Sequence, residues 1–174
     1  MRENKILDLH YQSYERDIPT IHLLHPYAVK LFKQRWYVIG LSEKKDRILI
    51  FAMDRIQELR ITNQKFRYPK EFNIHDYYRD SFGIIIDDII VAQRIRLKAM
   101  NNQAYYFRSL PLHPSQKEIE TLSEYSIFEY WLKPTYDFEQ EILSHREDVE
   151  VLEPAQLRET IKESILKMAK IYSL

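Results

Sequence analysis

Residues 36–41 read Trp36-Tyr37-Val38-Ile39-Gly40-Leu41, a run of strong strand formers that decides how the first half of the chain folds. After it, the polar residues 42–46 predict a hairpin turn, residues 47–53 a returning strand, and residues 54–63 a further one. Before it, residues 20–32 predict a strand, and residues 6–14 alternate with Leu7, Leu9 and Tyr11 on one face. Several short strands joined by tight turns favour a small β-barrel.

The second half of the chain alternates strand and helix patterns. Strands are expected at 89–97, 116–122, 127–132 and 149–152, and helices at 100–110, 137–144 and from Pro154 to about Tyr172. The order β-α-β-β-α-β-α is typical of a split α/β sandwich of the ferredoxin-like kind, so the whole chain is expected to be α+β. The last helix has an apolar stripe at helical spacing, formed by Leu157, Ile161, Ile165, Met168 and Ile171.

The segment from residue 71 to residue 88 separates these halves. Residues 71–80 differ in character from the strands before them, and Asn73 is a suitable N-cap for a short helix there. The pair Asp87-Asp88 then marks a boundary. We therefore expect two domains, one over residues 1–84 and one over residues 88–174.

The composition narrows the class of protein. The 174 residues include two glycines and no cysteine, which excludes a Gly-rich phosphate loop, disulfides and thiolate metal sites. No signal peptide or membrane span is visible, so a cytoplasmic protein without a membrane partner is expected. Residues 1–70 carry 14 Lys and Arg against 8 Asp and Glu, whereas residues 71–174 carry 12 against 18. This asymmetry suggests two domains with different partners, although chance clustering gives the same numbers.

Catalytic and metal-binding patterns are weak. His22 and His25 have a spacing that metal ligands use, but residues three apart on a strand point to opposite faces. No serine lies in a Gly-x-Ser-x-Gly setting. The adjacent carboxylates Asp87-Asp88 and Glu147-Asp148 diverge if they lie on strands. We therefore expect no catalytic residues, no metal site and no cofactor.

Basic and aromatic residues interleave across the first half. Arg can contact phosphate oxygens with two N–H groups, and aromatic rings can stack on bases, so this pattern is compatible with nucleic-acid binding. Strand parity places Trp36 and Tyr37 on opposite faces, so one of them is expected in the core. The alternative is that both rings are packing residues and the charges are ordinary surface. The residues concerned are His25, Tyr27, Lys30, Lys33, Arg35, Trp36, Tyr37, Arg47 and Arg55.

Three motifs in order resemble the WYL domain family over roughly residues 5–84. They are His25-Pro26-Tyr27, then Arg35-Trp36-Tyr37-Val38-Ile39-Gly40, then Phe51-Ala52-Met53-Asp54-Arg55-Ile56. Val38 stands in the third place of the triplet that names the family. Residues 88–174 resemble the WCX extension that often follows WYL domains, through Leu112-His113-Pro114-Ser115-Gln116, Ile142-Leu143-Ser144 and Val149-Glu150-Val151-Leu152-Glu153-Pro154 with Leu157-Arg158.

The resemblance implies a Sm-like (SH3-type) barrel that senses a nucleotide or single-stranded nucleic acid, followed by an extension linked to homodimer formation. Many members have an Arg where this chain has Leu49, and Arg47 is the expected substitute. Such regulators read duplex DNA through an N-terminal helix-turn-helix, which these 174 residues lack, so duplex binding is not expected of them. The residues expected to bind the effector are His25, Tyr27, Lys30, Tyr37, Arg47 and Arg55.

Three functions follow. The first is the effector-sensing and dimer-forming part of a bacterial transcription regulator. The second is a protein–protein interaction or dimerisation module with no small ligand, suggested by the apolar stripe of the last helix. The third is an enzyme acting on nucleic acid, which only the acidic clusters favour and which we place last.

Overall fold

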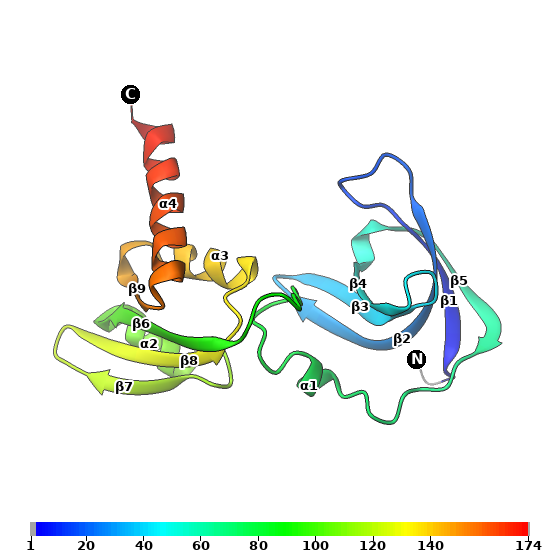
Figure 1. The fold of residues 1–174 in the computed structure, drawn as a ribbon, viewed down its shortest axis with the longest axis horizontal. Helices are drawn as coiled ribbons and strands as arrows, with labels where there is room; N and C mark the ends of the chain where they lie inside the picture. Colours follow the sequence, from blue (N-terminus) through cyan, green and yellow to red (C-terminus); the bar gives the residue numbers. More distant parts are fainter. Residues whose placement is uncertain (1–2, 174) are drawn as a thin grey trace. The chain divides into compact units, whose positions relative to one another are not determined.

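A computed structural model describes residues 3–173, and within it the chain divides into two compact units, residues 1–76 and 77–174. Each unit has its own antiparallel sheet (Figure 1). The chain is therefore α+β, as expected. The elements of the first unit are β1 (Lys5–Tyr11), β2 (Thr20–Phe32), β3 (Arg35–Ser42), β4 (Arg47–Ala52), the 3-10 turn η1 (Met53–Arg55), β5 (Ile56–Lys65) and α1 (Ile74–Tyr77), which crosses the division.

The first unit is a curved five-stranded sheet in the order β4-β3-β2-β1-β5. Within residues 3–173, β4 and β5 are its edge strands and no ladder of hydrogen bonds joins them, so the sheet is not closed. The alternation expected in β1 is confirmed, because Leu7, Leu9 and Tyr11 all belong to one apolar cluster on one face of the sheet. The other face is covered by the segment after β5, where Phe66 and Phe72 pack against Tyr27.

The hairpin turn predicted at residues 42–46 lies between β3 and β4. Lys33 and Gln34, between β2 and β3, both have positive φ, as does Asp46 in the next hairpin. Gly40 is required for a different reason. A Cβ built on Gly40 would lie 2.2 Å from the carbonyl oxygen of His25 on the neighbouring strand, so β2 and β3 approach too closely there for any side chain.

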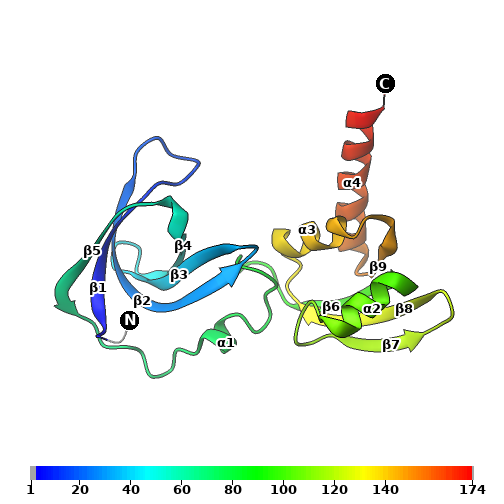
Figure 2. The ribbon, with the colours of Figure 1, turned by 180° about the vertical axis from the view of Figure 1, so that it is seen from behind.

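The second unit has the expected element order, with a sheet in the order β7-β8-β6-β9. All helices pack on one face of this sheet, where the core includes Leu97, Phe107, Phe128, Phe138 and Leu157. Figure 2 shows α2 lying along that face. The elements are β6 (Gln93–Met100), α2 (Asn101–Ser109), β7 (Lys117–Thr121), β8 (Tyr125–Leu132), α3 (Tyr136–Ser144), the 3-10 turn η2 (Arg146–Asp148), β9 (Val149–Glu153) and α4 (Ala155–Tyr172).

Only the first half of helix α4 packs into this core. Leu157 and Ile161, in its first half, are buried. The second half projects from the sheet (Figure 1) and its apolar side chains are exposed, with Ile171 at 78 %. The stripe predicted from the sequence therefore exists, but three of its five residues, Ile165, Met168 and Ile171, lie outside the core described for this unit.

The strand expected at 89–97 was wrong at its start, because β6 begins at Gln93. The side-chain oxygen Oδ1 of Asp87 accepts hydrogen bonds from the backbone N–H of Ile89 (2.7 Å) and Ile90 (3.2 Å). This local turn, which Asp favours, competes with strand formation. Ile89 is accordingly 90 % exposed.

The segment before this turn is hydrogen-bonded to α3 within the second unit. Asp137, in the first turn of α3, accepts hydrogen bonds from the backbone N–H of Ile84 (2.8 Å) and Ile85 (2.9 Å) through Oδ2. Gly83 has a φ of 82°, and a Cβ there would meet the same carboxylate at 2.5 Å. Asn73 caps α1 as predicted, since its side chain accepts the N–H of His75 at 2.8 Å.

Candidate functional site

The predicted binding residues fall into separate places on the first unit. His25 and Tyr27 lie in an aromatic cluster on the outer face of the sheet. The His25 ring stacks on Phe66 with centroids 4.8 Å apart, and its Nε2 lies 2.8 Å from a carboxylate oxygen of Glu43. Tyr27 is buried among the rings of Phe66, Tyr68 and Phe72. Both side chains therefore have packing roles, and a binding role for them stays a prediction.

Arg55 has the most unusual surroundings of the six. It ends the turn η1, and its guanidinium carbon lies 5.2 Å from the centroid of the Tyr11 ring and 4.6 Å from that of Tyr14. Contacts of this length are cation–π interactions. Its Nε is buried and has no hydrogen-bond partner among the described residues. A buried donor of this kind is uncommon and can be satisfied by a ligand or water.

Arg35 of β3 and Asp54 of the turn η1 lie beside Arg55. Arg35, at the start of β3, forms an ion pair with Asp54, with Nε and Oδ2 3.1 Å apart. The carboxylate of Asp54 raises the pKa of Arg35, and Tyr14 and Tyr37 add to the effect. We call this set the Arg55 cluster; its members are Tyr11, Tyr14, Arg35, Tyr37, Asp54 and Arg55.

Tyr11 is the buried wall of the Arg55 cluster. Its ring meets Phe51 edge-on at 5.0 Å. Burial raises the pKa of the Tyr11 phenol, and the positive charge of Arg55 opposes that rise. Tyr37 adds a smaller effect that raises the pKa of the same phenol, and this links it to the Arg55 cluster.

Lys30 and Arg47 are placed differently with respect to the cluster. Lys30 pairs in register with Tyr37, and directly opposed residues point to the same face of a sheet. On the other side Tyr37 pairs with Ala52, whereas Arg47 pairs with Ser42. Arg47 is thus five residues along β4 from the partner of Tyr37, or about 17 Å at the usual rise per residue. It lies exposed at the far end of the hairpin.

Sequence reasoning missed Tyr11 and Tyr14 as neighbours of Arg55. Their contact depends on the pairing of β1 with β5, in which Tyr11 is opposite Ile56 and the N–H of Gln12 donates to the carbonyl of Arg55 at 3.0 Å. The only local signal is the spacing of two tyrosines at the end of a strand. Of the two β3 aromatics, Trp36 is exposed and Tyr37 is half-buried.

An apolar cavity of about 490 Å³ opens beside the turn that carries Arg55. Met53 and Ile56, on either side of Asp54 and Arg55, belong to its wall. The full lining is Glu3, Lys5, Leu7, Pro26, Val29, Val38, Met53, Ile56, Leu59 and Ile61.

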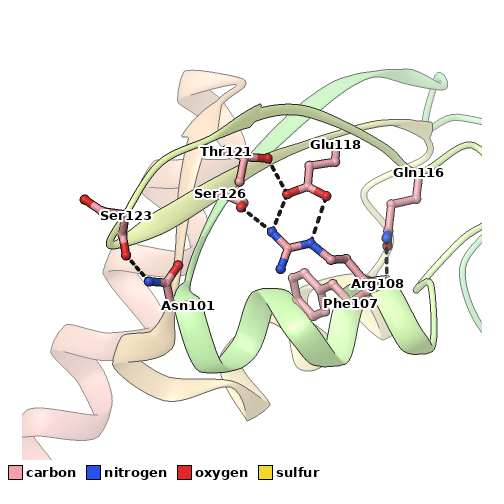
Figure 3. A network of polar contacts seen from close by, with 8 residues as sticks. All are labelled: Asn101, Phe107, Arg108, Gln116, Glu118, Thr121, Ser123 and Ser126. Atoms are coloured by element: carbon pink, nitrogen blue, oxygen red, sulfur yellow. Dashed lines mark hydrogen bonds and ion pairs between the residues drawn. The ribbon is translucent and has the colours of Figure 1, made fainter.

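The second unit has a polar network that ties α2 to β7 and β8 (Figure 3). Arg108 makes two hydrogen bonds to Glu118, at 2.9 and 2.6 Å, and a third to Ser126 at 2.8 Å. These contacts, led by the hydrogen bond from Arg108, lower the pKa of Glu118 to about 2. Gln116 donates to the carbonyl of Phe107 at 2.7 Å. Each charged member has its partner within the network, so we assign it a structural role.

Across residues 3–173 there is no group of three or more His, Asp or Glu side chains arranged to hold a metal ion. No helix among those residues is both long and apolar enough to cross a membrane.

Comparison with known proteins identifies both halves of the chain. Residues 1–61 match the WYL domain and residues 92–169 match the WCX domain. No curated protein matches the chain.

Two similar solved structures are both longer than this chain. One is the proteasome accessory factor B/C (PafBC) of Arthrobacter aurescens, with 16 % identity, a TM-score of 0.43, and coverage of 92 % of this chain and 24 % of its own. The other is a CRISPR Cas-related protein, with 16 % identity, a TM-score of 0.59, and coverage of 98 % of this chain and 48 % of its own. This chain thus spans less than half the length of either protein, and the second likeness is one of fold. With the two domain matches, the chain belongs to the family of WYL-domain proteins in which a WCX domain follows the WYL domain.

Proposed function

We propose that this chain is the effector-sensing part of a transcription regulator, and that it binds a nucleotide or single-stranded nucleic acid at the Arg55 cluster without catalysing a reaction. The observation that supports this most is Arg55 itself. A guanidinium held against two tyrosine rings, with a buried N–H that no described residue accepts, is prepared for an anionic ligand.

The residues around Arg55 also favour a ligand that has both a phosphate and a base. Residues 1–70 carry 14 Lys and Arg against 8 Asp and Glu, so the field around the first unit attracts phosphates. Tyr14 offers an exposed ring to a base. Lys30 and Tyr37 are opposite one another on the neighbouring strands.

The test is a fluorescence anisotropy titration of a labelled single-stranded oligonucleotide, with the duplex of the same sequence in parallel. We expect binding that prefers the single strand and weakens as salt is added, because counterions are released on binding. Arg55→Ala should weaken it at least tenfold, since a hydrogen bond to a charged group contributes roughly 1.5–3 kcal/mol.

The matched control is Lys45→Ala, which removes one positive charge from the exposed hairpin between β3 and β4. It should change the affinity far less than Arg55→Ala. Arg47→Ala serves as a second arm, since Arg47 was predicted to bind yet lies away from the cluster. An Arg55→Ala variant that binds as tightly as the wild type would count against the proposed site.

For the folds of the two units we propose the two classes that were expected from the sequence. The strand order of the first unit supports a Sm-like (SH3-type) barrel left open between β4 and β5. The order β7-β8-β6-β9, with helices on one face, supports a ferredoxin-like sandwich. We also keep the proposed domain limits of 1–84 and 88–174.

A second candidate function is self-association, as a dimerisation module without a small ligand. The observation that favours it is the exposed apolar side of α4, where Ile165, Met168 and Ile171 follow the buried Leu157 and Ile161. Contiguous exposed apolar patches often mark interfaces.

Sedimentation velocity over a range of protein concentrations tests this alternative. A homodimer through α4 should dissociate when Ile165 and Ile171 are both changed to Lys, and it should persist when Glu163, on the polar side of the helix, is changed to Lys. A wild-type chain that stays monomeric at every concentration would exclude this function.

A further inference from the structure

Tyr14 is the most exposed member of the Arg55 cluster. Tyr14 as a whole is 76 % exposed, although the centroid of its ring lies 4.6 Å from the guanidinium carbon of Arg55. An aromatic ring normally buries most of its surface when it packs. Tyr14 therefore has one part of its ring on Arg55 and a large part open to solvent.

The loop between β1 and β2 holds Tyr14 in this position through its own hydrogen bonds. The N–H of Gln12 donates to the carbonyl of Arg55 at 3.0 Å, so the start of the loop is tied to the turn η1. The side-chain amide of Gln12 donates to the carbonyls of Ser13 and Arg16. The N–H of Arg16 also donates to the carbonyl of Ser13, which closes a turn around Tyr14. The exposed ring is thus presented by an ordered turn.

The guanidinium of Arg55 can contact a ligand in two ways. A planar guanidinium can stack through its faces or donate through its N–H edge. The guanidinium carbon already lies over the rings of Tyr11 and Tyr14, 5.2 and 4.6 Å from their centroids. Two rings thus already serve Arg55 as aromatic partners, and its N–H groups suit phosphate oxygens. A base therefore has to find another aromatic surface, and the exposed part of the Tyr14 ring is adjacent.

The charges of the cluster decide which phosphate fits. Arg35 is already paired with Asp54 at 3.1 Å, whereas Nε of Arg55 has no hydrogen-bond partner among the described residues. The net charge of the three side chains is one positive unit. A phosphodiester carries a single negative charge, whereas a nucleoside triphosphate carries several and would be repelled by Asp54.

We infer that Tyr14 is the base-stacking residue of this site, and that Tyr14 and Arg55 together hold one unit of a single-stranded nucleic acid. The base lies on the exposed part of the Tyr14 ring, and one phosphodiester accepts hydrogen bonds from the edge of Arg55. This inference rests on the proposed function and narrows it from nucleotides in general to a single strand.

The test compares two labelled strands of equal length, oligothymidylate and an abasic strand that has the same phosphates but no bases. Tyr14→Ala should weaken binding of oligothymidylate roughly 5- to 150-fold, the usual effect of removing a stacking ring, and leave the abasic strand unchanged. Tyr14→Phe keeps the ring and should bind like the wild type. Arg55→Ala should weaken both strands.

The chain provides a matched control in its second unit. Tyr105 is also exposed, at 65 %, and its ring also lies against an arginine, with the Arg108 carbon 5.2 Å from its centroid. Tyr105→Ala should leave both affinities unchanged. A circular dichroism spectrum of each variant that matches the wild type establishes that the fold is intact.

The other outcomes separate the inference from the proposed function. Equal weakening of both strands by Tyr14→Ala would mean that Tyr14 only positions Arg55, and unchanged binding would mean that it takes no part; either result overturns the inference and leaves the proposed function standing. Competition by a thymidine triphosphate at lower concentration than by oligothymidylate overturns the choice of a phosphodiester. Absence of oligothymidylate binding to the wild type overturns the inference and leaves the proposed function with a free nucleotide as its ligand.

Discussion

Replacing Glu118 with Gln should destabilise the second unit by removing the charge from the pair with Arg108. The pKa of Glu118 falls from 4.5 to about 2, chiefly because of the hydrogen bond from Arg108. One pKa unit corresponds to about 1.4 kcal/mol, which sets an upper limit of about 3 kcal/mol on the contribution of these contacts. The side chain is still 25 % exposed, so solvent screening reduces the expected loss to about 1–2 kcal/mol.

The effect should depend on pH with a defined sign. Glu118 has a lowered pKa in the folded chain, so its contribution is complete above the unfolded value of 4.5 and is lost as the pH falls from 4.5 towards 2. The difference in free energy of unfolding between wild type and Glu118→Gln should therefore be full at pH 7 and small near pH 2.5.

Urea unfolding followed by tryptophan fluorescence measures this difference for one unit alone. Each unit has one tryptophan, Trp36 in the first and Trp131 in the second. A Trp36→Phe background thus reports only the second unit. The control is Glu120→Gln on the same strand, a substitution that removes an exposed charge. Equal stability of the two variants at pH 7, or a difference that persists unchanged at pH 2.5, would refute the reasoning.

Three further predictions concern single contacts. Gly40→Ala should destabilise the first unit by about 1–3 kcal/mol or more, seen as a lower urea midpoint in Trp36 fluorescence, because a Cβ would lie 2.2 Å from the His25 carbonyl oxygen. Burial lowers the pKa of His22, so the free energy of unfolding of the first unit should fall as the pH drops below 6.5, and His22→Gln should remove that part of the dependence. Asp137→Ala should speed hydrogen exchange at residues 84 and 85 about tenfold or more, since both N–H groups lose their acceptor; unchanged exchange rates would show that the carboxylate is not needed.

Features set by neighbouring residues could be predicted from the sequence. The alternation of Leu7, Leu9 and Tyr11 placed one face of β1 correctly, because strand parity is a local property. The N-cap at Asn73 was likewise readable, since the capping side chain and the N–H it accepts are two residues apart. The strand start at Gln93 was missed because the Asp87 turn and the strand pattern compete over the same residues.

Features set by distant residues could not be predicted in this way. Tyr14 and Arg55 are far apart in sequence and meet through the register between β1 and β5, which no local pattern specifies. The separation of Arg47 from Tyr37 depends on the register of β3 with β4, because that register makes Ala52 the partner of Tyr37 and Arg47 lies about 17 Å from Ala52 along β4. Family resemblance supplied Tyr37 and Arg55, but the tyrosine contacts of Arg55 required the structure.

The two halves of helix α4 contribute differently to the stability of the second unit. Its first half supplies Leu157 and Ile161 to the core, while the apolar residues after Ser164 are exposed. A stop codon after Ser164 would therefore shorten the protein without opening its core. Such a shortened chain would expose less apolar surface, which suits it to crystallisation and to spectroscopy of the Arg55 cluster.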